Sequence, residues 1–469
     1  MNTYGADNLS GIPQTVSTPA LPLGKLPFGF GRRFFLALAL GTLWLVPAWT
    51  MHSFIAAMFL WDALVCAAWL WDFLRLCRPD QLTVTRSWRM RPALAVASKV
   101  YVQVAAQSSL PLYIRALDEV PPALSIEQPA LEFELPAVGS LERSYSILPR
   151  ERGRITLGRV FLRYQSALQF AERRAVADLR QTVRVLPNIE EARRQTLRLI
   201  RGRYAEMDRR RHRQRGMGRE LDGLRDYREG DEFRNVAWSA TARRHRLITR
   251  VFQMERSQTV WLVLDAGRLL RARVQEPGSS LQLSKLDHAV NAALCLAQVA
   301  MHSGDKVGLL AYGSRVQQNL APNRGASFVR RFADSLAEIH SEAQEPDHTG
   351  AVRELLREQK RRSLIVWITD FAETATVPEV VESAMQMNPR HLVLFVAMNQ
   401  PELTELAAAI PNSQEDMYRH AAALEVSQRR DVLLRRLRQR GILAFEWAPW
   451  GLTTLLVNQY LDLKERNRL

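Results

Sequence analysis

The sequence has little cysteine and almost no lysine, and both shortages narrow what the protein can be. Its three cysteines, Cys66, Cys77 and Cys295, form no C-x-x-C pair. Three thiols without that spacing argue against a disulfide framework and against a cysteine-based zinc site. Only six of the 64 basic residues are lysines. The arginine excess fits either the codon usage of a GC-rich genome or bidentate pairing with carboxylate and phosphate groups.

The motifs of several common enzyme classes are missing as well. The chain has no G-x-x-x-x-G-K-[ST] phosphate loop, no G-x-S-x-G turn and no H-E-x-x-H pair. Its nine histidines are scattered along the sequence. We therefore expect that the protein is not an enzyme.

What the sequence does contain is an ordinary hydrophobic content and a strong positive charge. The 469 residues are 47% hydrophobic, which excludes a fully disordered or collagen-like chain. At roughly 150 residues per domain, the length predicts about three domains. The net charge of +16 and the pI near 10.3 make nucleic acid and an anionic membrane the partners to consider. The position of the charge along the chain decides between them.

Two apolar stretches predict a transmembrane helix hairpin over residues 32–78, preceded by a flexible N-terminal tail over 1–31. Residues 34–50 and 54–74 each approach the ~20 apolar residues that a membrane helix needs. Arginines flank the pair on both outer sides, which places both flanks in the cytoplasm. We expect a protein of the bacterial inner membrane with two membrane helices, the lipid bilayer as a partner and soluble domains in the cytoplasm.

Two other interpretations of these stretches stay open. Residues 32–36 resemble a twin-arginine export signal, although no small-residue cleavage site follows. A buried pair of core helices would also be apolar, although tryptophans near the ends of the stretches are typical of membrane interfaces. Asp62 lies inside the second stretch, where a carboxylate indicates either partial solvation or an intramembrane contact. Asp72 lies near the cytoplasmic end and is expected to reach water.

Residues 79–188 alternate apolar and polar residues in short runs, such as VYVQV at 100–104 and LEFEL at 131–135. Proline and glycine residues separate the runs. This spacing predicts an immunoglobulin-like β-sandwich of antiparallel strands. The region contains no nucleophile, metal-ligand cluster or phosphate loop, so we expect a spacer or interaction domain.

Residues 189–256 hold 19 arginines and 11 acidic residues, a net charge of +8. We predict a basic helical linker, because Leu197, Ile200, Tyr204 and Met207 recur at helical spacing. The run over 209–215 almost lacks the interleaved aromatics on which bases stack. It therefore favours a solvated face near an anionic leaflet over nucleic acid as the partner.

The stretch over 219–244 alternates charges and ends in a tryptophan and an arginine pair. Asp231 is placed to cap a helix in which residues 233, 236, 237 and 240 share one face. The stretch is either a salt-bridged surface helix or a specific docking element. In the second case the candidate partner-binding residues are Arg225, Tyr227, Gly230, Asp231, Arg234, Trp238 and Arg243.

From residue 257 to 469 strands and helices alternate, which predicts an α/β domain with a mostly parallel sheet. Strands are expected at 259–265, 306–312, 364–370, 392–397 and 442–446. Residues 401–440 are expected to be helical, with their arginines, Arg430 among them, on solvated faces. Asp265 and Asp370 end two of the strands, and ligands of this fold class bind beyond such ends.

The signature LRDYREGDEFRNVAWSATAR at Leu224–Arg243 is followed by ERSQT at 255–259 and the strand over 260–265. Arg152-Gly153, the VLPN at 185–188 and the YLDLK at 460–464 accompany it. With these motifs, the chain from about residue 79 onward resembles the bacterial MoxR-associated von Willebrand factor A-like proteins, a membrane-anchored family of unknown function. The resemblance implies a von Willebrand factor A-like fold and two N-terminal membrane helices. It also implies partnership with a MoxR-type AAA+ ATPase.

The resemblance further implies a Mg²⁺ site of the Asp-x-Ser-x-Ser type around Asp265 and Asp370, since such oxygens suit a hard cation. The sequence departs from that pattern, because Gly267 and Leu269 stand where the serines belong. Arg268 is placed to occupy the position electrostatically, and Thr349 or Asp347 stands near the missing threonine. We expect a degenerate site without metal or other cofactor, in which both aspartates cap loops or helices.

These observations predict a non-enzymatic, membrane-anchored adaptor or scaffold. It is expected to work with a MoxR-type AAA+ ATPase in the maturation or assembly of other proteins, with a client that the sequence does not identify. The alternative is a metal-dependent ligand-binding module of the von Willebrand factor A type.

Overall fold

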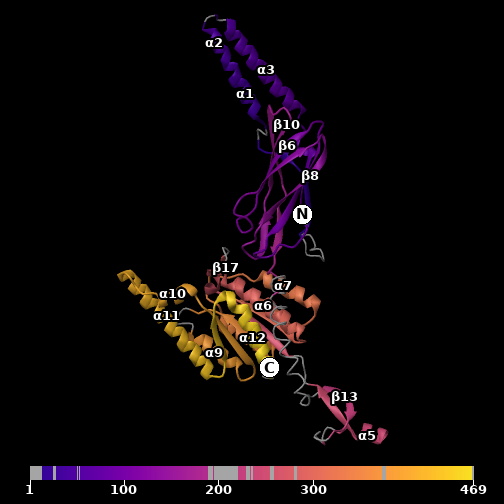
Figure 1. Cartoon of the computed structure of the whole chain (residues 1–469), viewed down its shortest axis with the longest axis vertical. Coiled ribbons are helices and arrows are strands. Elements are labelled where there is room, and N and C mark those ends of the chain that lie inside the picture. The colour runs from indigo at the N-terminus through magenta and orange to yellow at the C-terminus, as the bar shows by residue number, and fades with distance from the viewer. Residues whose placement is uncertain are drawn as a thin grey trace. The chain divides into compact units, whose positions relative to one another are not determined.

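The computed structural model describes residues 13–24, 28–49, 51, 53–188, 194, 220–228, 233, 236–253, 258–278, 282–371 and 377–466. The chain divides into two compact units, residues 1–186 and 187–469 (Figure 1). The helix predicted over residues 190–215 and the basic run within it fall almost wholly outside the described residues.

The first unit contains two helical segments that lie side by side (Figure 1). The first apolar stretch forms three short pieces, and the second forms one continuous helix. These are α1 (Arg32–Gly41), η1 (Thr42–Trp44), α2 (Leu45–Ala48) and α3 (Ser53–Arg75). Within the described residues, α3 alone is long and apolar enough to cross a membrane. Its 23 residues extend about 35 Å, slightly more than the hydrocarbon core of a bilayer.

The two segments pack closely where a glycine of α1 faces α3. A Cβ atom on Gly41 would lie 2.7 Å from the Trp61 ring and 2.9 Å from Asp62 Oδ1. The Trp61 indole N–H donates to the carbonyl of Ala37 over 2.8 Å. Asp62 Oδ1 is buried without a hydrogen-bond partner. Glycine at 41 thus permits a helix contact that any larger residue would open.

Asp72, near the end of α3, joins the helix to the β-strands and does not reach water as expected. It is fully buried. Its Oδ1 accepts from the Ser166 hydroxyl over 2.5 Å, and its Oδ2 accepts from the backbone N–H groups of Phe170 and Ala171 over 3.1 and 2.9 Å. Because the two amides begin the strand after a turn, the carboxylate fixes the direction of α3 relative to that turn.

Two antiparallel sheets make up most of the first unit, in the orders β1-β4-β5-β8 and β2-β11-β10-β6-β7, with β3 beside β11. Strands β9 and β12 form a separate pair. The strands are β1 (Val16–Pro19), β2 (Leu21–Pro22), β3 (Phe28–Phe30), β4 (Leu82–Trp88), β5 (Ser98–Gln107), β6 (Leu112–Asp118), β7 (Ala130–Leu135), β8 (Val138–Ile147), β9 (Gly153–Leu157), β10 (Val160–Ser166), β11 (Ala171–Ala177) and β12 (Gln181–Val185), with the short helix η2 (Pro79–Gln81) before β4. The antiparallel pairing is as predicted, and the immunoglobulin-like classification stays a prediction.

A buried polar group links the two sheets. Arg86 of β4 donates through Nε and Nη2 to both carboxylate oxygens of Asp118 in β6. The Tyr145 hydroxyl of β8 donates to the same carboxylate over 2.7 Å. Alternating burial along β4, β5, β6 and β10 turns the apolar side chains of each strand to one side. The ion pair therefore lies within an apolar layer between the sheets.

The prediction of a flexible tail over residues 1–31 is wrong for residues 16–22 and 28–30. Strand β1 pairs with β4, and strands β2 and β3 pair with β11, so this segment contributes to both sheets. The segment was not predicted as strand because it contains Pro19 and Pro22. Proline is tolerated in edge strands, where one side of the backbone needs no ladder partner. Residues 1–12 lie outside the described residues.

The signature region forms a strand–helix–strand hairpin, and the predicted helical linker is wrong here. Strand β13 (Glu220–Asp226) pairs antiparallel with β14 (Ile248–Gln253), and α5 (Trp238–Arg244) lies between them in sequence. Helix α5 begins later than expected, because the Ala237 N–H donates to the carbonyl of Ile248 and Val236 bridges to Thr249. The β-branched and aromatic residues of ITRVFQ favour strand at 248–253.

The second unit contains a six-stranded sheet in the order β19-β18-β15-β20-β21-β22, in which only β19 runs antiparallel. Its elements are β15 (Thr259–Asp265), η4 (Arg268–Arg271), β16 (Arg273–Gln275), β17 (Gln282–Ser284), α6 (Lys285–His302), β18 (Lys306–Tyr312), β19 (Val316–Asn323), α7 (Ala326–Glu338), α8 (His348–Glu358), β20 (Leu364–Thr369), α9 (Val377–Met387), β21 (Leu392–Met398), α10 (Pro401–Ala408), α11 (Gln414–Gln439), β22 (Leu443–Trp447), η5 (Pro449–Gly451) and α12 (Leu452–Glu465). All five predicted strands are present, in a mostly parallel sheet.

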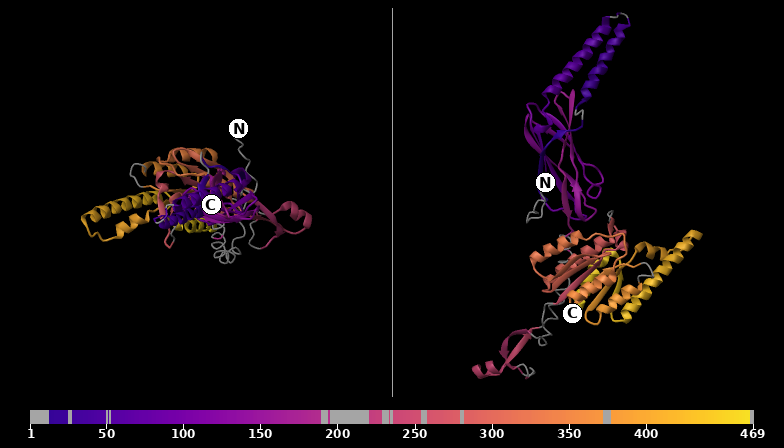
Figure 2. Two further views of the ribbon diagram at one scale, coloured as in Figure 1. Left: turned by 90° about the horizontal axis from the view of Figure 1, so that it is seen from above. Right: turned by 180° about the vertical axis from the view of Figure 1, so that it is seen from behind.

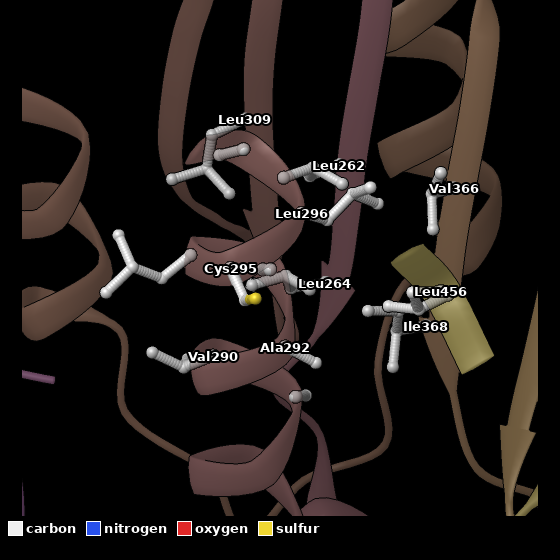
Figure 3. Close-up of a cluster of buried hydrophobic side chains, with 14 of the residues drawn as sticks. Leu262, Leu264, Val290, Ala292, Cys295, Leu296, Leu309, Val366, Ile368 and Leu456 are labelled. Atoms are coloured by element: carbon white, nitrogen blue, oxygen red, sulfur yellow. The ribbon is translucent and has the colours of Figure 1, made fainter. Parts of the chain in front are cut away.

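Both faces of this sheet are covered by helices, which explains why its strands are continuous apolar runs. Alternate residues of β15, such as Leu262 and Leu264, join a core with α6, α7 and α12 (Figure 3). The intervening residues, such as Trp261 and Val263, join a second core with α8, α9 and α11. The sheet is therefore rigid, and its carboxyl edge is a fixed platform.

The C-terminal motif at 460–464 has a structural role in this unit. The Tyr460 hydroxyl and Lys464 Nζ donate to Asp305 Oδ2 over 2.5 and 2.7 Å. Asp305 Oδ1 accepts from the backbone N–H of Gln258 over 2.9 Å. This group ties α12 to the start of β15 and to the turn before β18.

Candidate functional site

Asp265 and Asp370 lie together at the carboxyl edge of the sheet. Asp265 is the last residue of β15, and Asp370 follows Thr369, the last residue of the neighbouring parallel strand β20. The Thr369 hydroxyl donates to Asp265 Oδ2 over 2.6 Å. The sequence predicts this edge for both aspartates, because each ends a predicted strand of a mostly parallel sheet.

The Asp370 carboxylate is held by two cations of the chain itself. Lys285 Nζ lies 2.5 Å from Asp370 Oδ2, and Arg430 Nη1 lies 2.9 Å from Asp370 Oδ1. Lys285 is fully buried and Arg430 almost so. Arg430 also donates through Nε to Glu446 Oε1 over 2.7 Å. Two cations and two carboxylates therefore form a group without net charge.

Backbone acceptors complete the environment of Arg430. Its Nη1 donates to the carbonyl of Phe371 over 2.6 Å, and its Nη2 donates to the carbonyl of Met398 over 2.7 Å. The guanidinium lies 4.7 Å from the centre of the Phe371 ring. Arg430 thus joins α11 to the ends of β20 and β21. The prediction that Arg430 lies on a solvated helix face is wrong.

Asp265 is the unusual acid of the site. It accepts from the backbone N–H of Gly267 over 2.7 Å, besides Thr369. Burial, with a smaller contribution from the charge of Asp370, raises the pKa of Asp265 from 3.8 to about 7. Because the neighbouring group of four charges already balances, an ionised Asp265 would be a buried excess charge.

The residues around these aspartates do not fit a divalent cation. The ammonium of Lys285 and the guanidinium of Arg430 contact the carboxylate that a metal would need. A Cβ at Gly267 would lie 2.6 Å from the Pro346 ring, so a serine hydroxyl cannot be placed there without displacing that proline. Leu269 packs against the apolar core. Protein cations and apolar contacts take the positions that metal ligands would occupy.

The other predicted contributors each have a partner of their own. Arg268 pairs with Glu345 over 2.7 Å. The Thr349 hydroxyl donates to Glu379 over 3.0 Å, and Asp347 caps α8 by accepting from Gly350 N–H over 2.7 Å. Among the described residues, no group of three or more His, Cys, Asp and Glu is arranged to hold a metal.

Sequence reasoning missed Lys285, Thr369, Arg430 and Glu446. Lys285 carried one signal, since it is one of only six lysines and follows a capping serine at the start of an apolar helix. Arg430 carried none, because it lies in an arginine-rich helix in which its neighbours are exposed.

The structure describes four of the seven candidate docking residues. Arg225 lies in β13, and the Tyr227 N–H donates to the carbonyl of Leu247 over 2.9 Å. Trp238 and Arg243 lie on α5, where the Trp238 side chain is 61% exposed. Gly230, Asp231 and Arg234 lie outside the described residues.

One known family matches the region that contains both the signature hairpin and the residues around Asp265 and Asp370. Residues 223–436 match the family described as protein of unknown function DUF58. The DUF58 match begins in β13 and ends in α11, so it includes the signature hairpin, Asp265, Lys285, Asp370 and Arg430. It leaves out the helical pair and the antiparallel sheets of the first unit. No curated protein matches the chain in sequence.

Several solved structures are similar to part of the chain. The conserved hypothetical protein BatB from Bacteroides thetaiotaomicron is 13% identical over 45% of this chain and 100% of its own, with a TM-score of 0.29. The VWA domain of SpRpn10 is 11% identical over 43% of this chain and 95% of its own, with a TM-score of 0.27. Proximal thread matrix protein 1 from the mussel byssus is 9% identical over 44% and 48%, with a TM-score of 0.28.

The buried Asp265 predicts a pH-dependent stability. Its pKa is raised by folding, so the folded state carries no penalty below the ordinary value of 3.8 and the full penalty above about 7. Asp265→Asn removes the charge and keeps an oxygen for Gly267. We expect the variant to gain stability over the wild type as pH rises from 4 to 8, by at most about 1.4 kcal/mol per pH unit.

Hydrogen exchange of β15 in the full-length chain, compared between variant and wild type at each pH, measures this difference. Asp347→Asn is the matched control, because that carboxylate caps α8. A difference for Asp265→Asn that is constant from pH 4 to 8 would contradict the prediction.

Proposed function

We propose that the protein is a non-enzymatic, membrane-anchored adaptor that works with a MoxR-type AAA+ ATPase in the maturation or assembly of other proteins. The observation that carries the adaptor role is the closed carboxyl edge of the α/β sheet. Lys285 and Arg430 neutralise Asp370 where a ligand or metal would bind. With that edge filled by the chain's own side chains, we place recognition on the outer surfaces of the α/β unit and the signature hairpin.

The helical pair supports the membrane anchor. Large apolar side chains on α1, α2 and α3 are exposed, including Leu36, Val46, Phe59 and Leu74. Only 6% of the most apolar stretch of α3 is buried inside the protein. A soluble domain rarely exposes so large an apolar surface, whereas lipid would cover it. We propose that both segments insert into the bacterial inner membrane and that the arginine flanks hold the soluble units in the cytoplasm.

The ATPase partnership comes from the family resemblance of the sequence, and the signature hairpin offers a surface for it. Phe233, Trp238 and Leu247 are exposed there. Arg225 and Arg243 lie on the same hairpin. Exposed tryptophan and arginine are the residue types that most often dominate binding energy at protein interfaces. We assign the ATPase contact to this surface.

Affinity capture of the full-length chain from native membranes in detergent tests the proposal. With the ATPase held by a non-hydrolysable ATP analogue, we expect a MoxR-type ATPase to be recovered. Trp238→Ala should lower recovery about tenfold or more, as expected for an interface hot spot. Tyr113→Ala, an exposed aromatic of β6, serves as the control. Repeated failure to recover such an ATPase would reject the partnership.

The alternative, a metal-dependent ligand-binding module, has a separate test. Because Lys285 and Arg430 contact Asp370, we expect no heat on titration of the full-length chain with Mg²⁺ or Mn²⁺ and no shift in its melting temperature. Saturable binding that is lost in Asp370→Asn would instead favour the metal-dependent module.

A further inference from the structure

Helices α10 and α11 form an arm that extends beyond the sheet (Figures 1 and 2). The C-terminal half of α11 is rooted in the domain by Arg430, Leu433, Leu434 and Leu437, which are buried. No residue of α10 is buried, and in the N-terminal half of α11 only Ala423 is. The two helices contact each other, and His420 Nδ1 lies 2.9 Å from the carbonyl oxygen of Leu406.

The arm exposes apolar side chains where a solvated helix pair would carry polar ones. Ile410 in the turn is 85% exposed, and Met417 and Tyr418 are 60% and 70% exposed. Met417, Leu424 and Val432 follow the spacing of one helix face, and all three are exposed. The outer part of the arm, α10 and the N-terminal half of α11, buries too little surface to be more than marginally stable on its own. Its apolar side is the kind that a partner covers.

The charge of the arm narrows the choice of partner. Residues 401–425, the outer part of the arm, contain five acids and one arginine, a net charge of −4, whereas α10 and α11 as a whole are neutral. The acids are Glu402, Glu405, Glu415, Asp416 and Glu425. Glu415 pairs with Arg419, and Glu425 pairs with Arg429. Two arms whose outer parts face each other would bring these acids together, so like-charge repulsion opposes a symmetric arm-to-arm contact. The arm needs a partner that is both basic and apolar.

The signature hairpin has these properties. Its residues 236–253 contain four arginines, Arg243, Arg244, Arg246 and Arg250, and no acid, whereas the whole hairpin over 220–253 has a net charge of +1. Arg246 pairs with Asp226 of β13 over 3.1 Å, so Arg243, Arg244 and Arg250 are the basic side chains that the α5–β14 surface offers. All four are exposed, beside the exposed Trp238 and Leu247. Opposite charge and exposed apolar side chains on both surfaces are what a specific contact between them requires.

We propose that the α10–α11 arm of one chain docks on the α5–β14 surface of a second copy. The contact is heterologous, since different surfaces of the two copies meet, so it adds copies in a row or closes them into a ring. The proposal rests on the two surfaces and is independent of the ATPase partnership. If the hairpin also binds the ATPase, the two contacts exclude each other. Binding of the ATPase would then release the second copy from the hairpin.

Charge reversal in both surfaces of the full-length chain tests the contact. We expect the wild type in detergent to sediment as concentration-dependent oligomers that weaken as salt rises. Glu405→Lys with Glu415→Lys, or Arg243→Glu with Arg244→Glu, should each weaken association at least tenfold. Mixing the two double variants should restore it, because the reversed arm then faces the reversed hairpin.

Matched controls reverse exposed charges elsewhere in the same unit. They are Glu276→Lys with Glu382→Lys and Arg330→Glu with Arg331→Glu, and both pairs should associate as the wild type does. A wild type that stays monomeric overturns the proposal. Docking of the arm on the hairpin of the same chain also overturns it. Failure of the mixture to restore association also overturns it. The ATPase capture is a separate measurement, so either result stands without the other.

Discussion

Replacing Asp370 by asparagine is expected to lower the free energy of unfolding of the α/β unit by about 3–5 kcal/mol. The change leaves Lys285 fully buried without a counter-charge, and it removes one of the two carboxylates that contact Arg430. Asparagine keeps the oxygen that accepts from the Phe371 N–H. The loss in the free energy of unfolding therefore comes from the buried charges and not from the turn at Phe371. Hydrogen exchange of β20 and α11 in the full-length chain measures it.

A second substitution separates this effect from a general defect. Lys285→Met removes the ammonium and keeps much of the side-chain volume. In Asp370→Asn with Lys285→Met the remaining Arg430 and Glu446 pair balances in charge. We expect this double variant to recover most of the loss. The control is Glu354→Gln, whose exposed partner is Arg357, and it should change stability by about 0.5 kcal/mol or less. Equal losses in Asp370→Asn and Glu354→Gln would contradict the buried ion-pair interpretation.

The α/β unit was predictable because its pattern is local. Runs such as Leu392–Met398 are buried on both sides and carry no polar residue, so strand and sheet type follow from the sequence alone. Asp265 ends β15 and Asp370 directly follows β20, so the two aspartates meet at one edge of the parallel sheet. Their partners were not predictable, because Lys285 and Arg430 lie 85 and 60 residues from Asp370 in sequence. Only the packing of α6 and α11 on opposite faces brings both cations to that edge.

The first unit shows the converse limit. Three prolines and two glycines interrupt the sequence over 16–30, and its strands form because β4 and β11 offer edges to pair with. In the signature region, alternating charges and a good capping residue favoured a helix. The long-range pairing of β13 with β14 prevailed over that local preference. Both corrections concern segments whose structure depends on a partner strand.

Replacing Asp72 by alanine is expected to loosen the junction between α3 and the antiparallel sheets. The change leaves the N–H groups of Phe170 and Ala171 without their acceptor. Each buried polar group left unpaired costs about 1–3 kcal/mol, so local stability should fall by about 2–6 kcal/mol. Asp72→Asn keeps one acceptor oxygen and should lose less. Hydrogen exchange at Phe170 and Ala171 in nanodiscs is the measurement, and it should rise in the order wild type, asparagine, alanine.

The same helix supplies the control, because Asp62 differs from Asp72 in one decisive respect. Asp62 Oδ1 is buried without a hydrogen-bond partner, so Asp62→Asn should leave exchange at Phe170 and Ala171 unchanged. If Asp62→Asn and Asp72→Asn raise exchange equally, the effect comes from changing a carboxylate in α3 and not from the junction. If only Asp72 matters, the Asp72 carboxylate is what holds α3 and the antiparallel sheets together as one rigid unit.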